Sequence, residues 1–202
     1  LMIAFLTTVC CLLISILGSY AMTRLKYPGR RFFKTSIIFS YLIPTAVLFV
    51  PMYVFVSKLG FYDNKWALLI IYPTTVVPYC CYMLMSYFKA IPYALEEAAL
   101  IDGCTRMKSL RYIITPIALP GIAVVATFAF TMSWNEYLYA MIMTTSPAQQ
   151  TAVVAISSFK YADSAIWGRI MAASVLTSLP VTIIYIVAQA QLISGKSDGS
   201  VK

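Results

Sequence analysis

Residues 1–23 read LMIAFLTTVCCLLISILGSYAMT and contain no Asp, Glu, Lys or Arg. An α-helix needs about 20 apolar residues to cross the hydrocarbon core of a bilayer, so this run is long enough to span it. The whole chain has the same character, since 61% of its 202 residues are hydrophobic and only 11% are charged. Its mean hydropathy is +0.82. This composition indicates a membrane protein and argues against a soluble domain.

Further uncharged runs predict an all-α, polytopic transmembrane bundle that forms a single domain over residues 1–202. A polar stretch at residues 144–151 interrupts the uncharged segment 137–159 and would leave polar groups unsatisfied in lipid, so we expect an outer loop there. The loop over residues 89–116 and the tail over residues 195–202 are expected in the cytoplasm. The five predicted spans cover approximately residues 1–22, 35–57, 66–88, 117–142 and 168–191.

The distribution of basic residues predicts the orientation. Eleven of the 15 Lys and Arg residues follow the first, third and fifth spans, which therefore end in the cytoplasm by the positive-inside rule. The C-terminus is then cytoplasmic, in a multi-pass protein of the cell membrane. The net charge of +8 is explained by topology rather than by nucleic-acid binding. Because the first run would start outside and lacks a charged leader, we expect one or more further helices upstream of residue 1.

Composition also argues against catalysis. The chain has no histidine, and no aspartate falls within a predicted span. His-based metal sites, serine and cysteine triads and a paired-aspartate intramembrane protease are therefore not expected. The five cysteines lie in spans or in the cytoplasmic loop, so disulfides are not implied. We expect no bound cofactor or metal, and any catalytic step to lie on a partner.

Residues 89–116 read KAIPYALEEAALIDGCTRMKSLRYIITP, the one long cytoplasmic segment with helical features. Pro92 suits the first position of a helix, and Gly103 suits a left-handed stop. Thr105 can cap a second short helix. The small residues Ala94, Ala98 and Ala99 let the first helix lie in a groove of another protein, with Glu96 and Glu97 pairing with basic residues at its rim. An amphipathic helix on the membrane surface is the alternative.

This loop resembles the EAA loop of ABC-importer permeases. The matching residues are Glu97-Ala98-Ala99, Asp102-Gly103 and Leu119-Pro120. The further similarities are Tyr20-Ala21, Arg24 and Pro28-Gly29-Arg30 after the first span, Leu59-Gly60 with Asp63 outside the second, and Trp134-Asn135-Glu136 near the end of the fourth. Together with the tail, they resemble the carbohydrate-importer branch, and within it the maltose-permease type of subunit with a C-terminal tail.

The resemblance implies a type I ABC-importer permease that moves a mono-, di- or oligosaccharide. The expected partners are a second permease subunit, an ATPase dimer that binds ATP and Mg, an extracytoplasmic sugar-binding protein, the sugar and membrane lipid. The permease itself would not be an enzyme. The tail would contact the ATPase through Gly199, Ser200, Val201 and Lys202. The residues that would couple the permease to the ATPase are Glu96, Glu97, Ala98, Ala99, Asp102 and Gly103.

Near the outer end of the fourth span, Trp134, Asn135, Glu136 and Tyr137 form a second candidate site. Rings stack on sugar faces and carboxylate or amide groups bond hydroxyls, so these residues could gate the outer mouth or contact substrate. Interfacial anchoring and simple hydration are the alternatives. For the chain as a whole, a permease for an amino acid or polyamine is the alternative function. A signalling protein or an intramembrane enzyme is more remote.

Overall fold

A computed structural model describes residues 1–161, 164–165 and 167–197, without the side chains of residues 160–166 and 190–197. The described part is helical apart from one two-residue hairpin, β1 (Lys160–Tyr161) with β2 (Ser164–Ala165). This confirms the all-α expectation. The long helices are α1 (Met2–Arg24), α2 (Arg30–Leu42), α3 (Thr45–Lys58), α4 (Leu68–Ala90), α8 (Leu119–Asn135) and α11 (Trp167–Ser197). The short elements are η1 (Lys65–Ala67), α5 (Tyr93–Ile101), α6 (Arg106–Ser109), η2 (Leu110–Ile114), α7 (Thr115–Ile117), α9 (Leu138–Met143) and α10 (Ala152–Ser157).

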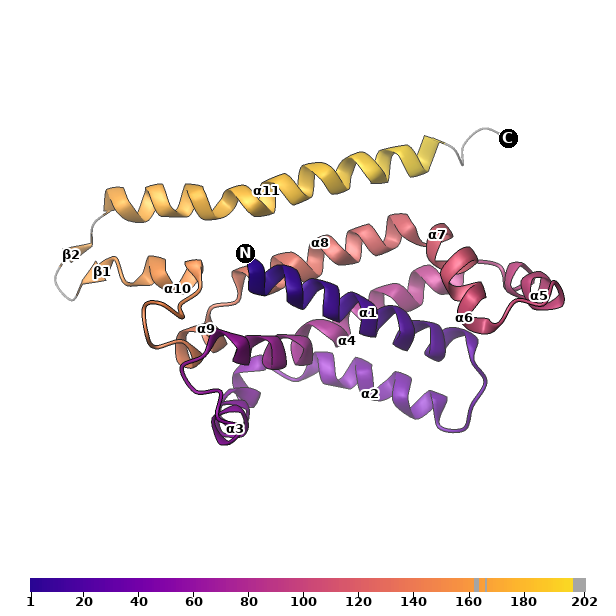
Figure 1. Ribbon diagram of the computed structural model, residues 1–202, viewed down its shortest axis with the longest axis horizontal. Coiled ribbons are helices and arrows are strands. Elements are labelled where there is room, and N and C mark those ends of the chain that lie inside the picture. The colour runs from indigo at the N-terminus through magenta and orange to yellow at the C-terminus, as the bar shows by residue number, and fades with distance from the viewer. Residues whose placement is uncertain (162–163, 166, 198–202) are drawn as a thin grey trace.

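The helices α1, α4 and α8 form the centre of the bundle and run alongside one another (Figure 1). Their contact is apolar, with Cys11, Leu84 and Val125 fully buried. Polar side chains also link the helices, since the Ser19 hydroxyl donates to the Cys81 carbonyl over 3.0 Å. Gly121 allows α8 to approach α4 closely, because a Cβ atom there would lie 2.5 Å from the Tyr87 ring.

A second apolar cluster closes the opposite end of the bundle from α5 and α6. Leu68, Ile71 and Tyr72 at the start of α4 pack there with Ala140 and Met143 of α9. In Figure 1 this end also carries α3, α10 and the β hairpin. Asn64 accepts a hydrogen bond from the Trp66 backbone amide over 3.0 Å and caps the short turn that leads into α4. The cluster therefore lies beside the outer candidate residues, which stand at the end of α8 and in the link to α9.

The predicted span over residues 35–57 is wrong as a single helix. The structure divides it into α2 and α3, which meet at 99°. Pro44 lies at the break and has no N–H to continue the ladder of α2, and it disfavours helical geometry at the preceding residue. Ile43 accordingly has an extended backbone, with φ −72° and ψ 121°. This pair is therefore a broken span or a re-entrant segment.

The structure also differs from the predicted span over residues 117–142. Its helix α8 ends at Asn135, and Glu136 takes an extended backbone before α9 begins at Leu138. At the other end, the segment Arg106–Ile117 joins α8 with a bend of 82°. By length and composition, three helices of the described chain could cross a membrane: α1, Lys65–Ala90 and Trp167–Gln189. The number rises to five if each bent pair counts as one span.

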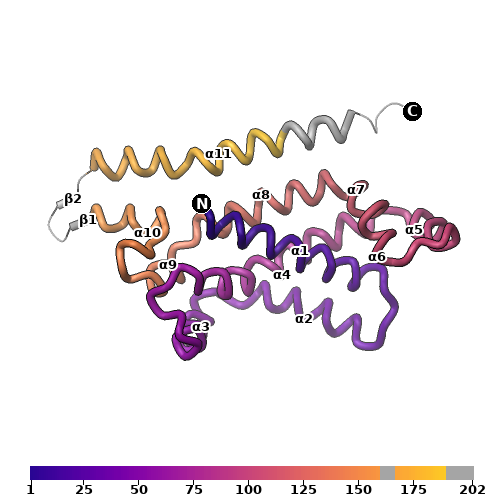
Figure 2. The backbone as a smooth tube through the Cα atoms, in the orientation of Figure 1, coloured from indigo at the N-terminus to yellow at the C-terminus, as the bar shows by residue number. Residues whose placement is uncertain are grey.

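Two helices lie at the edge of the bundle. Figure 2 shows α11 running along the outside of α8, and α2 on the other side of α1 and α4. No residue of α2 is buried, and Leu176, Ile183 and Ile186 on α11 are each about 60% exposed. Apolar side chains in such positions are suited to contact with lipid or with another transmembrane subunit.

Candidate functional sites

The helix α5 lies at one end of the bundle, between the end of α4 and α6 (Figure 1). It begins at Tyr93, directly after Pro92, one residue later than predicted. Gly103 has φ +83°, which confirms the expected left-handed stop. The Gly103 amide donates to the Leu100 carbonyl over 3.2 Å and the Cys104 amide donates to the Ala99 carbonyl over 2.9 Å. This pair of bonds is a Schellman motif, and it satisfies carbonyls at the end of α5.

The segment that follows returns the chain to the bundle. The Thr105 hydroxyl accepts from the Lys108 amide over 3.4 Å, as the predicted cap of α6 requires. Leu110 and Ile114 are buried against the core, whereas Met107 is 61% exposed. The apolar side chains of this segment are therefore divided between the core and the surface.

Glu96 is the polar centre of the contact between α5 and the bundle. It is only 4% exposed, although it is a carboxylate. The Tyr20 hydroxyl of α1 donates to Glu96 Oε1 over 2.5 Å. Arg24 Nε lies 3.8 Å from Glu96 Oε2, and Arg106 Nη1 lies 3.7 Å from Oε1. A buried carboxylate requires such partners, since an unpaired one would lose its hydration without compensation.

Arg24 connects this carboxylate to the end of α4. Its Nη2 donates to the carbonyls of Phe88 and Ile91, over 2.5 and 2.6 Å. Its guanidinium lies 4.1 Å from the centre of the Tyr93 ring, a cation–π distance. The Tyr93 hydroxyl in turn donates to the Thr23 carbonyl over 2.7 Å. We call Tyr20, Arg24, Glu96 and Arg106 the anchor network, because together they fasten α5 and α6 to the ends of α1 and α4.

Glu96, which was expected at the rim of a partner's groove, has its carboxylate bonded to Tyr20 and close to Arg24 within this chain. Ala99 is likewise 4% exposed and faces the bundle. Glu97 and Ala98 lie on the exposed side of α5, together with Leu95 and Ile101, which are 43% and 86% exposed. The surface available to a partner therefore combines one carboxylate, a small residue and two large apolar side chains.

A cavity of about 910 Å³ lies beside the anchor network. It opens between α5 and the loop that follows α1, and both Glu96 and Glu97 contribute to its wall. The basic residues around it are Arg24, Lys26, Arg30 and Arg106. Arg30 is held in place by two bonds of 2.8 Å to the Met22 and Thr23 carbonyls.

The four outer candidates do not form one site. Both carboxylate oxygens of Glu136 accept backbone amides of α9, from Tyr139 over 3.0 Å and from Ala140 over 3.1 Å. Glu136 is therefore the cap of α9. The Trp134 indole donates to the Thr177 carbonyl of α11 over 3.0 Å, and Asn135 and Tyr137 are exposed.

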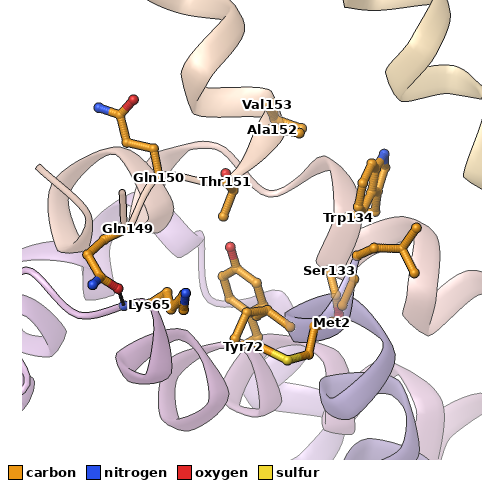
Figure 3. Close-up of a pocket in the computed structure, with 13 residues that line it drawn as sticks. Met2, Lys65, Tyr72, Ser133, Trp134, Gln149, Gln150, Thr151, Ala152 and Val153 are labelled. Carbon is orange, nitrogen blue, oxygen red and sulfur yellow. Dashed lines mark hydrogen bonds between the residues drawn. The ribbon is translucent and has the colours of Figure 1, made fainter. Parts of the chain in front are cut away.

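Trp134 alone among these four lines a cavity of about 220 Å³ at this end of the bundle, which we call the outer cavity. Tyr72 and Thr151 line it as well (Figure 3). Sequence reasoning missed both, and it noted Tyr20 and Arg24 of the anchor network only as similarities to the family, without a site role. For Arg24 a signal existed, because it is the first charge after an uncharged run of 23 residues.

The predicted tail residues 199–202 lie outside the described residues. Within the described part of the chain, no group of three or more His, Cys, Asp or Glu side chains could hold a metal ion.

The sequence is similar to permease proteins along its full length. It is 36% identical over 202 residues to the inner membrane ABC transporter permease protein YcjP of Escherichia coli (strain K12), covering 100% of this chain and 72% of that protein. It is 34% identical to the sulfoquinovosyl glycerol transport system permease protein SmoH of Agrobacterium fabrum, covering 100% and 70%. It is 33% identical to the trehalose/maltose transport system permease protein MalG of Thermococcus litoralis, covering 100% and 73%.

The fold is similar to that of solved ABC transporters. A bacterial ABC transporter involved in the import of the acidic polysaccharide alginate matches with a TM-score of 0.79 at 23% identity, over 93% of this chain and 70% of that one. The MetNI methionine ABC transporter matches with a TM-score of 0.72 at 19% identity, over 96% and 89%. The family model for the binding-protein-dependent transport system inner membrane component matches residues 2–196. The chain therefore belongs to this family, as a multi-pass inner-membrane permease of an ABC importer whose ATPase is a separate subunit.

Proposed function

We propose that this permease imports a sugar and that α5 receives the movement of the ATPase. Support for a sugar comes from the relatives, among which SmoH, MalG and the trehalose permease SugB of Mycobacterium tuberculosis are 30–34% identical over essentially the whole chain. The methionine importer shares only the fold at 19% identity, so it does not favour an amino acid.

The coupling proposal rests on one observation, that α5 has one side packed against the bundle and one side exposed. The inner side, with Glu96 and Ala99, is fastened to the bundle, and the outer side, with Glu97, Ala98 and Ile101, is exposed. A helix docking into a groove uses such an apolar side, with charge at the margin. Asp102 and Gly103 end α5 at this surface and set the direction of the chain into α6.

The anchor network supports transmission of a displacement. Moving α5 away from α1 would separate Glu96 from Tyr20 and Arg24 while all three remain poorly hydrated, which is unfavourable. A push on α5 is therefore expected to displace the ends of α1 and α4 with it. In this proposal Glu97 contacts the ATPase, and Glu96 is a positioning residue that acts through the bundle.

The coupling proposal is tested by reversing one exposed charge at each end of the molecule. Glu97→Lys should reduce sugar uptake and transport-linked ATPase activity at least tenfold in the reconstituted transporter, because it replaces a carboxylate at the contact with a cation. Lys58→Glu at the exposed end of α3 is the matched control and should change neither. Equal effects of the two variants, or no effect of either, would refute the role of the exposed side of α5.

The substrate is tested separately. Cells lacking this subunit should lose uptake of one or more labelled mono- or disaccharides and retain uptake of amino acids and polyamines. Affinity purification of the full transporter should recover a second permease and an ATPase. Loss of amino-acid or polyamine uptake instead would contradict the sugar assignment and leave the coupling experiment unaffected.

A further inference from the structure

Basic residues gather where α2 begins and α4 ends, at the end of the bundle that carries α5 (Figure 1). Three of the first five residues of α2 are basic, namely Arg30, Arg31 and Lys34. Because α2 packs against α4, the Lys34 side chain lies beside that of Lys89 in the last turn of α4, with Arg30 close to both. We call these four residues the basic cluster. Arg31 and Lys89 are exposed and Lys34 is half-buried, so a ligand can reach their side chains from outside.

The basic cluster has no counter-charge within the described part of the chain. Both ion pairs of the described side chains go to Glu96, from Arg24 and Arg106. Arg30 donates to carbonyls at the end of α1, which fixes its position without neutralising its charge. Like charges three or four positions apart on a helix repel each other, and the neighbouring lysines of α2 and α4 repel across the helix contact.

The position of the basic cluster on α2 adds to this repulsion. The N-terminus of a helix carries a partial positive charge, so cations in the first turn are unfavourable there. The first turn of α2 contains no acidic residue, and Gly29 at its start provides no side-chain cap. The positive-inside rule requires basic residues on one side of the membrane but does not require them to converge on one place. The convergence therefore favours a bound anion.

The surface next to the basic cluster is aromatic and apolar. Phe32 and Phe33 are both more than half exposed, and their rings meet edge to face with centres 5.9 Å apart. The Tyr27 ring lies 6.4 Å from that of Phe33. Beyond the cluster, residues 35–57 contain no charged residue, and Phe39 continues the exposed apolar surface of α2. Cations beside exposed rings at the start of an apolar stretch are typical of the boundary between headgroups and acyl chains.

We propose that the basic cluster binds the headgroup of one anionic phospholipid, with its phosphate between Lys34 and Lys89 and its acyl chains against the exposed side of α2. A phosphate in this position accepts charge-assisted hydrogen bonds from both ammonium groups and removes their mutual repulsion. A zwitterionic phospholipid has the same phosphate, but its own cation offsets the charge, so it should bind more weakly. The proposal depends neither on the sugar assignment nor on coupling through α5.

An acidic segment of the ATPase is the competing partner. It would neutralise the same cations, but it would leave the exposed rings of Phe32 and Phe33 uncovered on the side of α2. A free phosphate ion would do the same. The apolar surface that continues from the basic cluster therefore favours the lipid over both.

Native mass spectrometry of the full transporter in detergent counts bound lipids and measures their affinity. The protein is titrated with phosphatidylglycerol and, separately, with phosphatidylcholine. Lys34→Gln and Lys89→Gln, singly and together, each remove one charge and keep a polar side chain. Lys108→Gln and Arg111→Gln, singly and together, are the matched controls, because they remove the same charge at exposed positions in the segment after α5.

The parent should bind one phosphatidylglycerol more tightly than any phosphatidylcholine. Each variant of the basic cluster should weaken that binding about fivefold, and the two together about 30-fold, as expected for basic residues that contact an anionic lipid. The controls should bind like the parent. Phosphatidylglycerol should also raise the midpoint of thermal unfolding more in the parent than in the double variant, because a ligand stabilises the folded state that binds it. Inorganic phosphate at the same concentration should not displace the lipid, since it has no acyl chains.

Equal weakening by the double variant and by the double control would indicate general attraction by net charge and overturn the site. Equal affinity for the two lipids, or displacement of phosphatidylglycerol by inorganic phosphate, would also refute it. Cross-linking of Lys34 or Lys89 to a carboxylate of the ATPase by a carbodiimide would identify a protein partner in place of the lipid. The sugar assignment and the coupling role of α5 would stand in each of these cases, because uptake and ATPase activity are measured separately.

Discussion

The contacts of the anchor network predict how much free energy is needed to open α5 locally. Replacing Arg24 with Met removes the cation beside Glu96 and leaves the Phe88 and Ile91 carbonyls without their donor. Two charge-assisted bonds are lost, each worth about 1.5–3 kcal/mol, and breaking a buried ion pair is destabilising by about 3–5 kcal/mol. These terms describe the same contacts and are not additive, the Arg24–Glu96 pair is long at 3.8 Å, and the Tyr20 hydroxyl still bonds Glu96, so about 2–3 kcal/mol is expected for opening α5.

Glu96→Gln should have a smaller effect. The amide oxygen can still accept from the Tyr20 hydroxyl, and the ion pair that is lost is long, at 3.8 Å from Arg24. The contact with Arg106 contributes little, because the Arg106 side chain is 57% exposed and screened by solvent. About 1 kcal/mol is expected. The double variant should be less destabilised than the sum of the two, by about 0.5–2 kcal/mol, because the residues share one network.

Hydrogen exchange of the α5 amides in the assembled transporter in lipid nanodiscs measures this opening. Exchange should accelerate about 30- to 160-fold in Arg24→Met and about fivefold in Glu96→Gln, as these free energies imply. Glu97→Gln is the matched control and should exchange like the parent, since Glu97 lies on the exposed side. If Arg24→Met exchanges no faster than this control, the anchor network does not hold α5 and the proposed transmission path is wrong.

Three further predictions concern single contacts. Gly103→Val should destabilise the end of α5 by about 1–2 kcal/mol, because a β-branched residue is unfavourable at φ +83°, and uptake should fall while membrane insertion measured by protease protection is retained. Gly121→Ala should lower the stability of the purified transporter in thermal unfolding by about 1–3 kcal/mol, through the clash with Tyr87. Adding Tyr87→Ala in the same chain should restore that stability, and a double variant as unstable as Gly121→Ala would contradict this origin. Bonds from the Ser146 amide and hydroxyl lower the pKa of Asp63 below its ordinary value of 3.8, so the link between the two outer loops should be present above that pH and lost as the pH falls through the lowered pKa. Proteolysis of the outer loop should therefore accelerate at acidic pH in the parent, and should not vary with pH in Asp63→Asn.

The sequence predicted those parts of the architecture that a local feature is enough to specify. Uncharged runs long enough to cross a bilayer indicate helices wherever they fold, and Gly103 indicates a left-handed stop because other residues are strained there. The short helix after Pro92 and the cap at Thr105 follow from the same kind of reasoning. Pro44 explains why the second predicted span is interrupted, but the 99° angle between α2 and α3 depends on what each half packs against.

The sequence by itself determined that this chain is a membrane-spanning bundle with a short capped helix between two spans, because hydrophobic run length and backbone preference are properties of neighbouring residues. Tertiary structure alone decided that Glu96 faces Tyr20 and Arg24 while Glu97 faces outward. Adjacent residues on a helix point about 100° apart, and packing of the whole helix determines which of them is buried. Likewise Tyr72 and Thr151 meet at one cavity only because α4 and the loop before α10 pack at the same end of the bundle.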